Sequence, residues 1–230
     1  AHAAADNKAM KGTATIGYWV GNYSGSSSAM GEKAYQRFLP VIGATMKYKD
    51  NYYFAAEFAT AKDTEITEQG TMVDPLYTIK TDKLLFGVRY MIPDKPDMYA
   101  SLSYRSNEFT WNDRNTPAYS VSAKVQGFRL GIGGKEKLEG QPITLSGDLG
   151  YGIMTKTNIS LSNGLSLTPK TSTVDYELRA TYSMRKYKFR PQVGYRYENN
   201  KINSDVVSGI TLPEMSLKLR GYFIGAEMDF

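Results

Sequence analysis

The chain contains no cysteine, only one histidine and no long apolar run. Without cysteine there is neither a disulfide framework nor a thiolate that could act as a nucleophile or metal ligand. No segment approaches the roughly 20 consecutive apolar residues that a transmembrane helix needs. The mean hydropathy of −0.42 is also too polar for a helical membrane protein. A membrane-spanning strand turns only every second residue to lipid, so these values remain compatible with a β-barrel.

Tyrosine is abundant, with 18 Tyr beside 9 Phe and 2 Trp in 230 residues. Tyrosine suits β-strands and also the interfacial girdles of membrane barrels. The net charge is +5, and the basic residues are spaced singly along the chain rather than clustered. That spacing argues against a nucleic-acid partner.

Ten stretches alternate apolar and polar side chains with a period of two, which is the signature of β-strands with two different faces. No helical period longer than a turn or two interrupts them, and no repeat of solenoid length is present. Short turns alternate with long polar connections, expected at about 23–38, 61–81, 106–119, 156–172 and 198–215. The predicted strands lie at about 13–22, 41–49, 52–59, 84–92, 98–105, 127–133, 143–153, 174–185, 189–197 and 216–230.

The last stretch, SLKLRGYFIGAEMDF, ends on an aromatic residue after an apolar alternation through Tyr222, Ile224, Met228 and Phe230. It resembles the C-terminal strand of bacterial outer-membrane β-barrels, in which the closing aromatic is part of the signal read by the barrel-assembly machinery. The alternation of short turns and long loops is also typical of that class. Leu217 and Leu219 have the opposite parity, which predicts either a bulge near Arg220–Gly221 or a strand that continues beyond the lipid.

These patterns predict an all-β chain that forms one closed antiparallel transmembrane β-barrel of about ten strands. The expected domain covers residues 12–230 and carries five long extracellular loops, and residues 1–11 are expected to be a disordered, processed end. An even number of strands places both termini on the short-turn side. In the class that the chain resembles, this side faces the periplasm. The resemblance implies the bacterial outer membrane as location, with membrane lipid, lipopolysaccharide and the assembly machinery as partners.

One face of each strand is nearly free of charge at its centre, as hydrocarbon requires, so the other face is expected to line the lumen. Its Gly, Ser and Thr suit a narrow bore, and unpaired buried charges are costly, so the charges there are expected to pair. Two interpretations follow: a plug that stiffens the barrel, or a narrow, mildly anion-preferring, porin-like channel for small solutes. The predicted lumen charge network comprises Glu57, Arg89, Arg105, Arg129, Asp148, Glu177, Arg179, Arg190, Arg196 and Glu227.

The only histidine is His2, in the expected processed end. Omptin-like proteases, and barrel enzymes that modify lipid A, depend on a histidine near the reacting group. The sequence therefore predicts no enzyme, no catalytic residues, no cofactor and no metal site, and leaves a histidine-free hydrolase as the exception.

The long connections form a second candidate surface, because Tyr35, Arg37, Trp111 and Arg114 are residue types that often anchor binding. In architecture alone, they resemble the loops of ten-stranded adhesins of the Opc type. The alternative is that these side chains only pack the loops together or lie at the lipid interface. The leading prediction is a non-enzymatic outer-membrane barrel with a charge-paired lumen and ligand-presenting loops; its external ligand is not indicated by the sequence.

Overall fold

A computed structural model describes residues 11–27, 31–63, 77–113, 120–184, 187–207 and 210–230 of the chain. None of these residues forms a helix long and apolar enough to span a membrane. The described chain is almost entirely strand. The strands are β1 Gly12–Ser27, β2 Gly31–Lys49, β3 Tyr52–Asp63, β4 Tyr77–Ile92, β5 Lys95–Asp113, β6 Ser120–Lys137, β7 Ile143–Leu161, β8 Ser166–Leu167, β9 Thr171–Tyr182, β10 Phe189–Ile202, β11 Asp205–Val207, β12 Ile210–Leu212 and β13 Met215–Asp229.

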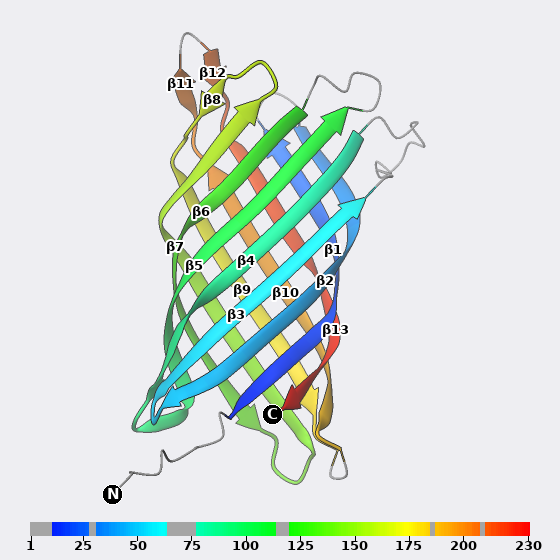
Figure 1. Ribbon diagram of the computed structural model, residues 1–230, viewed down its shortest axis with the longest axis vertical. Helices are drawn as coiled ribbons and strands as arrows, with labels where there is room; N and C mark the ends of the chain where they lie inside the picture. Colours follow the sequence, from blue (N-terminus) through cyan, green and yellow to red (C-terminus); the bar gives the residue numbers. More distant parts are fainter. Residues whose placement is uncertain (1–10, 28–30, 64–76, 114–119, 185–186, 208–209) are drawn as a thin grey trace, which may run out of the picture.

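Ten of these strands close into an antiparallel barrel in the order β6-β5-β4-β3-β2-β1-β13-β10-β9-β7, and β7 pairs with β6 to complete the circle (Figure 1). β1 pairs with β2 on one side and with β13 on the other. Backbone hydrogen bonds in both directions join Gly12 and Phe230, at 3.1 and 3.0 Å. The predicted fold class is thus confirmed. Gly12 and Phe230 lie at the end of the barrel that carries the short turns, which we call the terminal end.

At the opposite end the strands are longer than predicted. β1 continues to Ser27 and β2 already begins at Gly31, so the connection expected at 23–38 is mostly a two-stranded extension of the sheet. β5 likewise runs to Asp113, well into the connection expected at 106–119. Beyond the apolar band the outward positions become polar, so the alternation fades from the sequence while the backbone ladder continues. β8 and the β11–β12 hairpin lie in the remaining connections.

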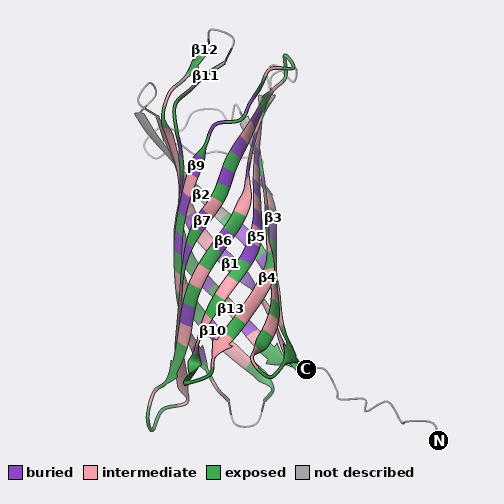
Figure 2. Cartoon of the chain, turned by 90° about the vertical axis from the view of Figure 1, so that its left-hand side faces the viewer, coloured by how far each residue is buried: buried purple, intermediate pink, exposed green. Residues whose placement is uncertain are grey.

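The outer surface is apolar, as the alternation predicts. Ile16, Ile42 and Leu178 are 58–62% exposed, although each lies mid-strand. Their sequence neighbours on the opposite face are mostly buried or half-buried, which gives the alternating bands along each strand (Figure 2). A barrel that turns these side chains outward satisfies its backbone internally and exposes hydrocarbon to its surroundings, as a lipid bilayer demands.

The expected bulge at Arg220–Gly221 is absent, because β13 pairs with β1 in unbroken register through these residues. Leu219 instead faces inward and is buried, so the alternative expectation of a strand that continues beyond the band describes this region. A bulge does occur in β7, where Met154 has a φ of 50° and the register with β6 shifts. On the terminal side of the bulge, even-numbered residues of β7 such as Gly152 face inward. Beyond the bulge, odd-numbered residues such as Thr155 face inward.

Candidate functional site

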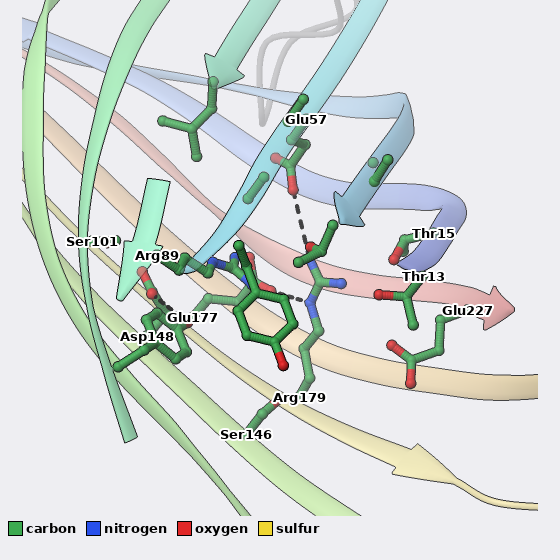
Figure 3. Close-up of a pocket in the computed structure, with 18 of the residues that line it drawn as sticks. Thr13, Thr15, Glu57, Arg89, Ser101, Ser146, Asp148, Glu177, Arg179 and Glu227 are labelled. Carbon is green, nitrogen blue, oxygen red and sulfur yellow. Dashed lines mark hydrogen bonds and ion pairs between the residues drawn. The ribbon is translucent and has the colours of Figure 1, made fainter. Parts of the chain in front are cut away.

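Two opposite walls of the barrel are joined through Glu57 of β3. Its carboxylate accepts a hydrogen bond of 2.6 Å from Arg196 of β10 and lies 3.6 Å from the guanidinium of Arg179 of β9. Four strands separate β3 from β9 in either direction around the barrel. Glu177 contacts the same two arginines, so two acids and two arginines form one cluster across the bore. Glu57, Glu177 and Arg179 of this cluster are labelled in Figure 3.

A second bridge crosses the barrel further from the terminal end. Lys83 of β4 donates to Glu198 of β10 at 2.6 Å, and both side chains are buried. Asn107 donates to the other oxygen of Glu198 at 2.6 Å, and Asn200 donates to that oxygen at 3.0 Å. The carboxylate is therefore fully hydrogen-bonded, which is the condition under which a buried charge is tolerated.

Arg129 of β6 is the centre of a further set of ion pairs in the lumen. It donates to Asp175 at 2.6 Å and also pairs with Asp148, whose other oxygen accepts a 2.6 Å hydrogen bond from the Tyr99 hydroxyl. Arg105 pairs with Asp175 from the opposite side. The result is a chain of alternating charges on β5, β6, β7 and β9, in which each acid serves more than one donor.

Small residues make room for this chain. A Cβ atom added to Gly150 would lie 2.0 Å from Nε of Arg129, and one added to Gly131, the register partner of Gly150, would lie 2.5 Å from Nη1 of the same arginine. The guanidinium thus rests directly on two glycines of the barrel wall. Any side chain at either position would force it away from Asp148 and Asp175.

β13, β1, β2 and β3 also carry an apolar cluster on their inward faces. Trp19 is 2% exposed and packs in this cluster with Leu39, Val41, Ala59, Leu219 and Phe223. Lys83 Nζ lies 4.6 Å from the Trp19 ring centroid, and the Arg196 guanidinium lies 4.8 Å from it. Arg179 lies 4.4 Å from the ring of Phe223. Cation–π contacts of this kind join the charged side chains of the lumen to the apolar cluster.

The lumen holds a cavity of about 890 Å³, which we call the chamber. It is lined by residues from the strand ends at Lys11 and Phe230 up to Lys83, Asn107 and Glu198. Inward side chains beyond that level, such as Val125 and Ile202, are fully buried and do not line it.

At the mouth of this chamber, Arg190 donates to Asp229 at 2.8 and 2.5 Å and lies 2.8 Å from Glu227. Arg89 of β4 is different: its guanidinium lies 4.8 Å from the Tyr99 ring, and it makes no ion pair with any described residue. In the described part of the chain, no group of three or more acidic or histidine side chains is arranged to hold a metal ion.

All ten residues of the predicted lumen network lie on inward-facing positions, and nine of them join ion pairs; Arg89 is the tenth. Sequence reasoning missed Lys83 and Glu198, because they fall at the edges of expected loops. It also missed Trp19, whose parity alone indicated an inward position. Of the loop candidates, Tyr35, Arg37 and Trp111 lie on strands β2 and β5, whereas Arg114 lies outside the described residues. Tyr222, Ile224, Met228 and Phe230 all face outward and are exposed.

A closed ten-stranded antiparallel barrel that is apolar outside and charged inside has the fold of bacterial outer-membrane β-barrels. The *Escherichia coli* outer membrane protease OmpT is similar in structure, with a TM-score of 0.59 at 9% identity over 100% of this chain and 99% of that one. The translocator domain of the autotransporter NalP from *Neisseria meningitidis* has a TM-score of 0.45 at 16% identity, covering 96% and 88% of the two chains. No family model and no curated protein matches the sequence.

Proposed function

We propose that this protein is a sealed, non-enzymatic outer-membrane barrel that presents its strand extensions on the cell surface and does not conduct solutes. The observation that carries the proposal is the pair of bridges across the bore, Glu57–Arg196 and Lys83–Glu198, backed by the apolar cluster around Trp19. Opening a path would require the separation of buried ion pairs, each of which leaves uncompensated charge behind.

The proposed partner of the outer face of the barrel is membrane lipid. In the proposed orientation the terminal end faces the periplasm, and the strand extensions lie beyond the outer leaflet. Above the apolar band the outward positions become charged, and Lys80 pairs with Asp82 at 2.6 Å there. Outward lysines such as Lys124 and Lys156 at this level suit contact with the phosphate groups of lipopolysaccharide. We also propose that the barrel-assembly machinery recognises the C-terminal strand.

The extensions are the natural place for an external ligand. β1 and β2 form a paired ribbon up to Ser27 and Gly31, and β4 and β5 pair up to Tyr77 and Asp113. Such ribbons hold their side chains more rigidly than irregular loops do, which favours a surface that binds a partner without ordering costs. An adhesin role is the form of this proposal in which that partner is a host molecule.

The likeness to OmpT shows the fold alone, and the single histidine of this chain, His2, lies outside the described residues. We therefore propose no enzymatic activity. A narrow channel is the second candidate, and the 890 Å³ chamber favours it, because solutes already have access to half of the bore.

Osmotic swelling of proteoliposomes separates the two candidates. Vesicles that contain the purified barrel are expected to swell in arabinose no faster than protein-free vesicles. The double variant Glu57→Ser/Arg196→Ser removes one bridge. It is expected to raise the swelling rate only if the Lys83–Glu198 bridge opens as well. Rapid swelling with the unaltered protein would establish the channel and overturn the sealed barrel.

A further inference from the structure

Arg89 is the exception among the lumen arginines. Of the six inward arginines whose side chains are described, Arg105, Arg129, Arg179, Arg190 and Arg196 each pair with a carboxylate. Arg89 lines the chamber, and its guanidinium carbon lies 4.8 Å from the centroid of the Tyr99 ring. A contact of the cation with a ring face leaves the fork of N–H donors of a guanidinium available to an oxygen ligand.

Further donors without partners lie on the neighbouring strand. The Oγ atoms of Ser101 and Ser103 and Nη1 of Arg105 are buried and make no hydrogen bond with the described residues. Ser103 and Arg105 are only 7% and 6% exposed, and all three side chains line the chamber. Ser101 is the direct register partner of Arg89. Buried donors left without acceptors are costly, so a ligand that brings several acceptor oxygens would be stabilised here.

The strands on either side of β5 carry glycines beside these donors. Gly87 is the register partner of Ser103, and Gly131, against which Arg129 packs, is the partner of Ser101 on the other side. Ser101 and Arg105 are four residues apart on one strand, roughly 13 Å. Arg89, the register partner of Ser101, and Arg105 thus both line the chamber, and Ser103 lies between Ser101 and Arg105 on β5.

The unpaired charges at the mouth of the chamber are, like Arg89, mostly positive. Lys11, Lys47 and Lys135 line the chamber and form no ion pair with described residues, whereas Glu227 and Asp229 are held by Arg190. Asp97 is the one described acid of the mouth without such a partner. An excess of unpaired cations at the entrance of a low-dielectric chamber concentrates anions inside it.

From these observations we infer that the chamber is a binding site for a small organic oxyanion, a carboxylate or a phosphate ester, with Arg89 as its anchor and Ser101, Ser103 and Arg105 as further donors. Guanidinium groups bind both anion types through paired, charge-assisted hydrogen bonds. The volume of about 890 Å³ admits a ligand of the size of a sugar phosphate. The inference goes beyond the proposed function, because a barrel that leaked would alter the swelling result without altering the dependence of binding on Arg89.

Thiol chemistry tests the chamber without knowledge of the natural ligand, because the chain contains no cysteine. Ser146 lines the chamber, so the variant Ser146→Cys is labelled with an anionic and with a cationic methanethiosulfonate reagent of similar size. The anionic reagent is expected to react faster, and Arg89→Gln is expected to reduce the ratio of the two rates by about fivefold. Lys95→Gln is the matched control, since Lys95 is exposed at the start of β5, at the same end, and does not line the chamber.

Equilibrium dialysis with citrate, glucose 6-phosphate and glucose then tests binding itself. Saturable binding of at least one of the two anions in the millimolar range or tighter is expected, with none of the neutral sugar. Arg89→Gln should weaken it by about tenfold or more, and Ser101→Ala should weaken it less, while Lys95→Gln leaves it unchanged. Binding of neither anion, equal loss in Lys95→Gln, or a reagent ratio that is indifferent to Arg89 would each overturn the inference. Retention of the folded, heat-modifiable band in gels shows that each variant still forms the barrel.

Discussion

Lys83 and Glu198 lie on strands that have four other strands between them in either direction around the barrel, and yet their charged ends are 2.6 Å apart. At that level the bore is narrow enough for two side chains to span it from opposite walls. Both residues also line the inner end of the chamber. The proposed central feature of the protein is therefore a barrel that its own side chains close.

A double-mutant cycle measures the strength of the Lys83–Glu198 bridge. Lys83→Met or Glu198→Gln alone leaves a buried charge without its partner, and each is expected to lower the free energy of unfolding by about 3–5 kcal/mol. The double variant should lose clearly less than the sum of the two. Urea-induced unfolding in lipid vesicles provides the values, and strict additivity would show that the two groups do not interact.

Substitution of a wall glycine should displace Arg129. In Gly150→Ala the new methyl group would fall 2.0 Å from Nε of the guanidinium, and we expect a loss of about 1–3 kcal/mol in the free energy of unfolding. Gly147→Ala is the control on the same strand, because its Cβ would face only the flexible end of Leu178 at 3.3 Å. Equal effects of the two variants would contradict the packing described for Arg129.

Tryptophan fluorescence distinguishes the two faces of β1. Trp19 is 2% exposed in the lumen, whereas its neighbour Tyr18 is 57% exposed on the outer face. In a Trp111→Phe background, Trp19 should resist quenching by lipids with brominated acyl chains. The variant Trp19→Phe/Tyr18→Trp, in the same background, should be quenched strongly. Reversal of this pattern would mean that the inner and outer faces have been exchanged.

A charge placed in the apolar band should be costly. Leu130 is 49% exposed on the outer face of β6, and Leu130→Arg is expected to lower the free energy of unfolding in vesicles by about 2–4 kcal/mol. Ser122→Arg, on the same face of the same strand but above the band, should cost less than about 1 kcal/mol. Similar costs at both sites would show that the band does not contact hydrocarbon.

The sequence predicts the barrel well wherever one face meets lipid and the other meets the lumen, since the two environments impose the alternation. Glu57, Arg129 and Arg196 could be placed inward for this reason. Lys83 and Glu198 could not, because near the end of the band the outward positions become polar as well, and parity no longer separates the faces. Nor could the pairing be predicted, because a bridge between β4 and β10 depends on the width of the closed barrel and not on local pattern. The placement of Arg89 beside Ser101 likewise exists only once β4 and β5 are paired.

Current through a planar lipid bilayer that contains the purified barrel tests the closure of the bore most directly. Because the Lys83–Glu198 and Glu57–Arg196 bridges and the Trp19 cluster fill the lumen, we expect no regular single-channel openings at moderate voltage after confirmed insertion. Uniform, ohmic openings of the unaltered protein that disappear when the protein is denatured would contradict this account.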